Sequence, residues 1–143
     1  MTTTQRLRVG DELQPYVRTL TAAQMKSYST WPEGQRNMRN QHTDEAVAKS
    51  LGRPGVIAQG LQISALVHEL LTQGFGAAWM RGGTLKVRFL KMVVSGDTLT
   101  VSGRVTAVEP LPDADRVTID IQAQNQRGEL PLVGTATVRV PRR

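Results

Sequence analysis

The chain has 143 residues, with 18 Lys and Arg against 12 Asp and Glu, no Cys, and 39% hydrophobic residues. This length fits one domain over residues 1–143, and the apolar fraction excludes a disordered chain. Without Cys there are no disulfides, thiolate metal sites or Cys nucleophiles. No stretch is long and apolar enough for a signal peptide or a membrane helix, so we expect a cytoplasmic protein that does not enter a membrane.

The net charge of +6 favours an anionic partner or ligand. The charges are scattered, however, and two Phe, two Tyr and two Trp are too few for a base-stacking platform. We therefore do not expect nucleic acid binding, and a phosphate-bearing coenzyme accounts for the charge equally well. The two His, His42 and His68, lie too far apart in the sequence to predict a metal site.

The chain begins with mixed structure. A weak strand is predicted over 13–20, although Pro15 interrupts it. The segment from Thr21 to Gln24 has the pattern of a capping box and predicts a short helix that ends near residue 28. An irregular polar loop is expected over 29–41.

Two further helices are predicted. The first is short, with Thr43 as its N-cap and Gly52 just beyond its C-terminus. The second is the longest, from about 57 to 73, and its glycine-rich exit over 74–83 is expected to be mobile. Its apolar stripe is formed by Ile63, Leu66, Val67, Leu70 and Leu71.

From residue 84 onward the apolar residues alternate with polar ones, which predicts strands that bury one face. The predicted strands cover 85–89, 98–107, 117–123 and 136–140. Together the two halves predict an α+β domain in which a long central helix lies on a curled antiparallel sheet. Such a sheet has edge strands, which are often paired across a dimer.

Several segments resemble the MaoC-like hydratase/dehydratase family of the hot-dog fold, which includes the (R)-specific enoyl-CoA hydratases. They are Val9-Gly10-Asp11, His42 to Glu45 with Ala48, GRPGVIAQG at 52–60 and VRFLKMVVSGDTLTVSGRV at 87–105. The resemblance covers about residues 7–140. It implies a helix wrapped by a five- or six-stranded sheet, a dimer with sites between the protomers, and reversible syn addition of water to a trans-2-enoyl thioester.

The resemblance also implies which residues act. The family holds and activates water with an Asp and a His five residues apart, and it polarises the thioester carbonyl with a Gly N–H at a helix N-terminus. Here His42 matches the His and Gly60 matches the Gly. Asn37 stands where the Asp is expected. If the loop carries an insertion, Asn40 corresponds instead to an Asn of the family pattern. Glu33 is the loop's one carboxylate and an alternative.

Each of these residues also has a structural interpretation. Asn37 and Asn40 could form local turns, and Gly60 could permit close packing. Gln59 replaces the family's usual His, and it could contact substrate or cap the helix. We expect Gln59, Arg53, Trp79 and Arg88 to bind substrate, with Trp79 lining an acyl tunnel or a dimer contact.

The sequence thus predicts a hydro-lyase that acts on an enoyl or 3-hydroxyacyl thioester. His42 is its acid/base, Asn37 or Asn40 orients water or substrate, and Gly60 binds the carbonyl oxygen. No cofactor is bound, because coenzyme A or phosphopantetheine is part of the substrate. The alternatives are an acyl-thioester-binding subunit of a hetero-oligomeric dehydratase, a repurposed isomerase, cyclase or dehydratase of a polyketide-like substrate, and a thioesterase that uses Glu69.

Overall fold

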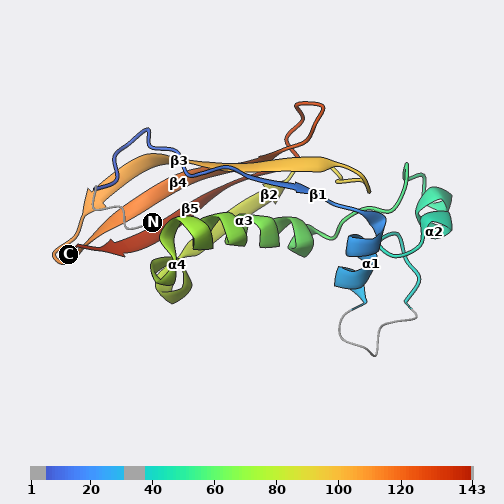
Figure 1. Ribbon diagram of the computed structural model, residues 1–143, viewed down its shortest axis with the longest axis horizontal. Coiled ribbons are helices and arrows are strands. Elements are labelled where there is room, and N and C mark those ends of the chain that lie inside the picture. Colours follow the sequence, from blue (N-terminus) through green and yellow to red (C-terminus); the bar gives the residue numbers. More distant parts are fainter. Residues whose placement is uncertain (1–5, 31–37, 143) are drawn as a thin grey trace.

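The computed structural model describes residues 6–30 and 38–142. Figure 1 shows the strands as one curved layer, with the longest helix along one face and two short helices beyond its N-terminal end. In chain order the elements are β1 (Tyr16–Thr19), α1 (Ala22–Ser29), α2 (Glu45–Ser50), α3 (Gly60–Phe75), α4 (Ala77–Gly82), β2 (Thr84–Phe89), β3 (Thr98–Pro110), β4 (Ala114–Gln124) and β5 (Leu132–Pro141).

The sheet has the strand order β1-β3-β4-β5-β2, and every neighbouring pair is antiparallel. All the predicted strands are present, and β3, β4 and β5 are longer than predicted. β1 begins only after Pro15, which has no N–H to donate to the neighbouring strand. The register between β3 and β4 shifts at Val105 and Ala107, a bulge that adds twist to the sheet.

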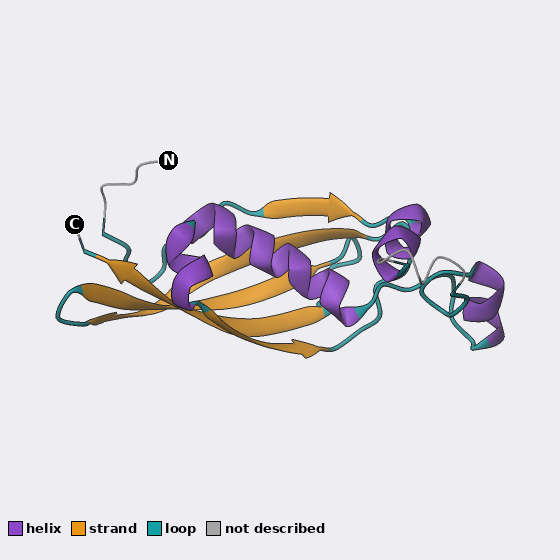
Figure 2. Ribbon diagram, turned by 90° about the horizontal axis from the view of Figure 1, so that it is seen from below, coloured by secondary structure: helices purple, strands orange, loops and turns teal. Residues whose placement is uncertain are grey.

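The core lies between α3 and one face of the sheet (Figure 2). The predicted stripe of α3 is entirely buried there. It packs against the inward-facing side chains of the strands, which alternate with exposed ones along β3 and β4. The α+β fold with a central helix and a curled antiparallel sheet is therefore confirmed. No helix in the described ranges is long and apolar enough to cross a membrane.

The long helix begins at Gly60, three residues later than the sequence predicts. The preceding residues are extended instead. Ile57 forms a β-bridge with Val94, and the Ala58 N–H donates to the Val93 carbonyl at 2.9 Å. This extended segment fixes the direction in which α3 enters the core, and it forms one wall of the site described below.

The glycine-rich segment after α3 contains the short helix α4, where the sequence predicts a mobile exit. Gly76, with φ of 54°, turns the chain between the two helices. Trp79 is buried, and its ring lies over Gly83, where a Cβ atom would come within 1.9 Å of Trp79 Cε3. These glycines thus serve a tight turn and close packing, which composition alone does not distinguish from a loop.

The capping box predicted for α1 is confirmed. The Gln24 N–H donates to Thr21 Oγ1 at 3.2 Å, and the Thr21 N–H donates to Gln24 Oε1 at 3.0 Å. Two side chains of α1, Met25 and Ser29, are buried. The helix is therefore held at its start by the cap and along one side by packing.

The N-cap of α2 is Asp44 and not Thr43 as predicted. Asp44 Oδ1 accepts the Val47 N–H at 3.1 Å. The Thr43 hydroxyl instead donates to the Met38 carbonyl at 2.8 Å, so it is used in the preceding turn. Gly52 lies just beyond the helix with φ of 75°, in the place predicted for it.

Candidate active site

His42 is held by a backbone carbonyl. The oxygen of Ile57 lies 2.8 Å from His42 Nδ1. A carbonyl oxygen can only accept a hydrogen bond, so Nδ1 carries the proton and Nε2 of the neutral ring keeps a free lone pair. The Ile57 N–H donates in turn to the Gln41 carbonyl at 3.1 Å, which ties the two segments together. The half-buried imidazole therefore presents Nε2 as a proton acceptor.

Asn40 forms the turn that carries His42. Its side-chain oxygen accepts the His42 N–H at 2.8 Å, and its own N–H donates to Thr43 Oγ1 at 2.9 Å. Its carbonyl accepts the Asp44 N–H at 2.9 Å. The Asn40 amide oxygen is thus used within the loop, so only the side-chain NH₂ is left to orient water or substrate. Asn37, like Glu33, lies outside the described residues.

The carboxylate nearest to His42 in the sequence is occupied elsewhere. Asp44 caps α2 and pairs with Arg39 at 2.8 Å. The Val47 N–H, and next the Arg39 guanidinium, lower the pKa of Asp44. Among the residues that the structure describes, no carboxylate contacts the His42 ring.

The N-terminus of α3 is the second part of the site. In the described part of the chain, the N–H groups of Gly60 and Leu61 have no acceptor, while those of Gln62 and Ile63 bond to the Gln59 carbonyl. Free N–H groups and the helix dipole favour a negative charge at this point. Gly60 follows Ile57 by three residues, so their Cα atoms are at most about 11 Å apart.

Gln59 occupies the N-cap position, but its side chain does not cap the helix. Its Nε2 instead donates to the buried Ser29 Oγ at 2.9 Å. This bond joins the end of α1 to the start of α3. Gln59 therefore positions α1 beside the N-terminus of α3. The sequence predicted either a substrate contact or a helix cap for Gln59, and this structural role is neither of them.

Gly60 is covered by Phe89 at the end of β2. A Cβ atom on Gly60 would lie 3.1 Å from Phe89 Cζ, closer than ordinary van der Waals contact. The ring thus packs directly against the backbone of the first residue of α3. A side chain here would have to shift the ring by a few tenths of an ångström, which supports the packing interpretation of Gly60.

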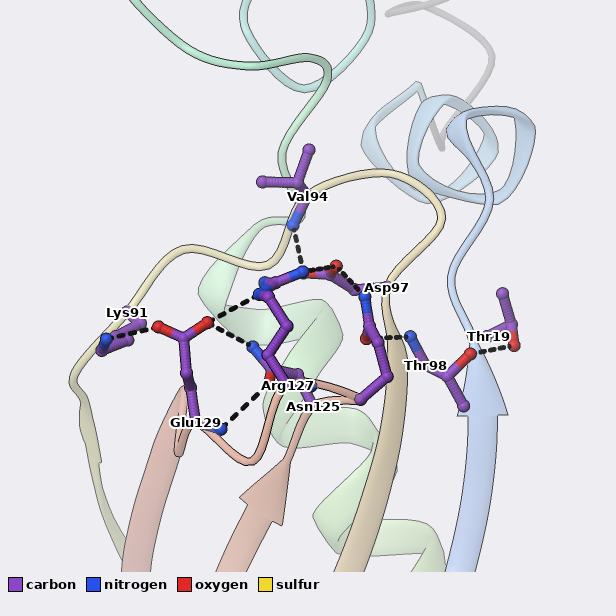
Figure 3. Close-up of polar contacts among 9 residues, drawn as sticks. Thr19, Lys91, Val94, Asp97, Thr98, Asn125, Arg127 and Glu129 are labelled. Atoms are coloured by element: carbon purple, nitrogen blue, oxygen red, sulfur yellow. Dashed lines mark hydrogen bonds and ion pairs between the residues drawn. The ribbon is translucent and has the colours of Figure 1, made fainter.

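A polar network supports the segment that holds His42 (Figure 3). The buried Asp97 accepts the Val94 N–H at 3.0 Å and Arg127 Nη1 at 3.0 Å. Glu129 accepts hydrogen bonds from Lys91 and Arg127. Because Val94 is bridged to Ile57, the network anchors the backbone whose carbonyl holds the imidazole.

The other predicted substrate-binding residues lie at different distances from this site. Arg53 is beside it, since its Nε donates to Gln41 Oε1 at 3.2 Å. Arg88 is exposed on β2 and precedes Phe89, so it lies near Gly60 on the opposite face of the strand. Trp79 is buried beyond the far end of α3, with its ring centroid 5.4 Å from that of His68. The structure does not bring Trp79 to His42 and Gly60.

Three parts of the site were not identified from the sequence. The Ile57 carbonyl is a backbone group, so no residue type marks it. Ser29 is 30 positions from Gln59, and Phe89 reaches Gly60 only through the sheet. No cluster of His, Asp or Glu that could hold a metal occurs in the described ranges. The arrangement offers a base, polar side chains and N–H donors, which suit proton transfer beside a carbonyl.

Comparisons with known proteins match the chain to solved structures of the same fold. The chain is similar to a MaoC-like dehydratase from Rhodospirillum rubrum, with 29% identity over 96% of this chain and 94% of that one, and a TM-score of 0.77. It is also similar to an (R)-hydratase from A. caviae involved in PHA biosynthesis, with 25% identity over 96% and 100% of the chains, and a TM-score of 0.77.

The ChsH1–ChsH2 complex from Mycobacterium tuberculosis, 23% identical over the whole of both chains with a TM-score of 0.72, shares the fold. No curated protein sequence matches the chain. The sequence matches the family described as "MaoC like domain" over residues 7–126. The chain, a hot-dog fold with a central helix, therefore belongs to the MaoC-like domain family.

Proposed function

We propose that this protein is a hydro-lyase that reversibly adds water to an enoyl thioester of coenzyme A or a carrier protein. Family membership and likeness to an (R)-hydratase support a hydratase-type role. The observation that carries the proposal is the hydrogen bond between His42 Nδ1 and the Ile57 carbonyl, because it leaves Nε2 free to act as a base.

In the hydration direction, His42 Nε2 takes a proton from water as the water oxygen adds to C3 of the enoyl group. Negative charge then develops on the thioester oxygen, which accepts the Gly60 N–H at the positive end of α3. The imidazolium returns its proton to C2, so both additions occur on the same face. The Asn40 side-chain NH₂, or Asn37, orients the water or the substrate.

The thioester itself supplies the acidity at C2, so the reaction needs no bound cofactor. Coenzyme A or phosphopantetheine enters as part of the substrate. Arg53 offers positive charge beside His42, which suits the phosphates of either carrier. Arg88 lies on the face of β2 that points away from Gly60, so it could meet the carrier only outside the site.

The test is incubation of the purified chain with crotonyl-CoA, with products followed by loss of the conjugated double bond and by mass spectrometry. We expect a product heavier by one water, and dehydration when 3-hydroxybutyryl-CoA is supplied. A folded chain that converts neither compound, nor a longer enoyl-CoA, would contradict the simple hydratase proposal.

A second candidate is an acyl-thioester-binding subunit of a hetero-oligomeric dehydratase. It is favoured by one observation: in the described ranges, the His42 ring is held by a carbonyl and contacts no carboxylate. A binding subunit would bind enoyl-CoA without converting it and would gain turnover only with a second chain. Turnover by this chain alone would reject this candidate.

A further inference from the structure

An open groove of about 820 Å³ lies between β1, α1 and α3. This volume is typical of small-molecule sites, which have about 300–1,000 Å³. Gln59 and Leu61, the residues on either side of Gly60, line the groove. The groove therefore begins at the N-terminus of α3, where the proposed function places the thioester carbonyl.

The groove follows one face of α3. Gln62, Leu66 and Glu69 line it at intervals of four and three residues, the spacing of a single helix face. Glu69 is nine residues beyond Gly60, which corresponds to about 13 Å along the helix axis. A ligand lying in the groove with its carbonyl at Gly60 thus reaches Glu69 at its other end.

That far end is polar. The Tyr16 hydroxyl donates to Glu69, and Arg18 Nε donates to the Tyr16 oxygen at 2.6 Å. Arg18 Nη2 lies 3.9 Å from Glu69 Oε1, and the guanidinium carbon lies 4.9 Å from the centre of the Tyr16 ring. The side chains of Arg18 and Glu69 are 53% and 42% exposed, so a ligand can reach both a donor and an acceptor.

The exposed surfaces of Arg18 and Glu69 are hydrated when the groove is empty. A purely hydrocarbon ligand would remove water from both side chains without replacing its hydrogen bonds.

We propose that the groove binds the acyl chain of the thioester and selects chains with a distal hydroxyl group, which donates to Glu69 and accepts from Arg18. A hydroxyl is favoured because it is both donor and acceptor, as the pair requires. An extended chain advances about 1.2 Å per bond, so the hydroxyl lies about 11 bonds from the thioester carbonyl. The inference rests on the proposed function, which places the carbonyl at Gly60.

The test compares the binding of two saturated thioesters, which cannot be hydrated, by isothermal titration calorimetry. We expect ω-hydroxydodecanoyl-CoA to bind the wild type about tenfold more tightly than dodecanoyl-CoA. Glu69→Met and Arg18→Met each reduce this preference, while Glu109→Met, which breaks a surface ion pair with Arg116, keeps it. ω-Hydroxyhexanoyl-CoA is too short to reach Glu69, so it shows no preference over hexanoyl-CoA.

Equal binding of the two long thioesters to the wild type would overturn the inference, as would a preference that survives both Glu69→Met and Arg18→Met. Arg18 and Glu69 are exposed enough that their variants are expected to fold, and thermal melting checks this. Turnover of crotonyl-CoA and of a longer enoyl-CoA distinguishes the two proposals. Hydroxyl-selective binding without turnover of either compound supports the groove and rejects the hydratase, whereas turnover without selectivity does the reverse.

Discussion

At the scale of single residues, two carboxylates hold the loops beneath the candidate site. Hydrogen bonds from Lys91 first, and then from Arg127 and Asn125, lower the pKa of Glu129 to about 2. Burial acts to raise the pKa of Asp97, but hydrogen bonds from Arg127, Gln126 and the Val94 N–H outweigh it and leave this pKa below its ordinary value. Both groups therefore stabilise the folded protein in their charged forms.

This predicts a specific loss of stability in acid. Because the pKa of Glu129 is lower in the folded protein than its ordinary value of 4.5, its contribution is complete above that pH and is lost as the pH falls towards 2. Melting temperatures of the wild type and Glu129→Gln, measured in steps from pH 7 to about pH 2, should therefore converge as the pH falls. A difference that stays constant over that range would contradict the prediction.

The residue scale also shows what sequence can and cannot identify in the site. His42 and Gly60 were identified because their spacing and neighbours match a family pattern. The hydrogen-bond partner of His42 was not identified, because it is the backbone carbonyl of Ile57 and every residue type has such a carbonyl. Asn40 was singled out as a site residue or a turn former, and its oxygen bonds to the backbone of its own turn, which only the fold defines.

At the scale of elements, β5 and β2 are closely packed at Gly134. Gly134 pairs with Val87 on β2 and with Ile121 on β4. A Cβ atom on Gly134 would lie 2.5 Å from the Lys86 carbonyl oxygen, which is part of the backbone and cannot rotate away. The absence of a side chain at Gly134 thus allows β2 to join the sheet.

We predict that Gly134→Ala lowers the free energy of unfolding by about 1–3 kcal/mol, the usual cost of overpacking. Gly82→Ala is the matched control. Apart from its chain neighbours and its own helix backbone, no atom of the described residues lies within 4 Å of a Cβ there, and Gly82 is in helix α4, where Ala is favoured. Urea denaturation should show Gly82→Ala equal to or more stable than the wild type. Equal stability of the two variants would refute the packing argument.

The elements were predicted best where the pattern is long and periodic. The stripe of α3 and the alternation in β3 to β5 both follow from burial of one face. The errors occur at boundaries set by tertiary contacts. Ile57 is apolar and fits a helical stripe, but its bridge to Val94 keeps it extended. The glycines around α4 indicate a loop by composition, although the segment is helical and its buried Trp79 packs against Gly83.

At the scale of the whole molecule, β2 is an edge strand that pairs only with β5 among residues 6–30 and 38–142. Large apolar side chains are exposed at its end, among them Phe89 and Leu90, each about half exposed, and Met92. Leu61, 70% exposed, lies next to Gly60 on α3. An unpaired edge beside exposed apolar side chains favours pairing with a second copy.

We therefore propose a homodimer formed through the β2 edge. Light scattering should give a mass twice the 15.7 kDa of the chain. Leu90→Asp, which places a charge beside this edge, should shift the protein to monomer. Val17→Asp is the control, because Val17 is equally exposed on β1 at the other edge of the sheet. A wild type that stays at 15.7 kDa at every concentration would exclude the homodimer.

The central claim of the account is that His42 Nε2 moves the proton, and its most direct test is hydration of crotonyl-CoA by the wild type, His42→Ala and His68→Ala. His68 is the chain's other histidine and is exposed in the middle of α3, so its variant controls for loss of an imidazole. We predict a loss of 100-fold or more in kcat for His42→Ala, about 2.7 kcal/mol in the barrier, and little change for His68→Ala. Equal turnover by a folded His42→Ala protein would contradict the account.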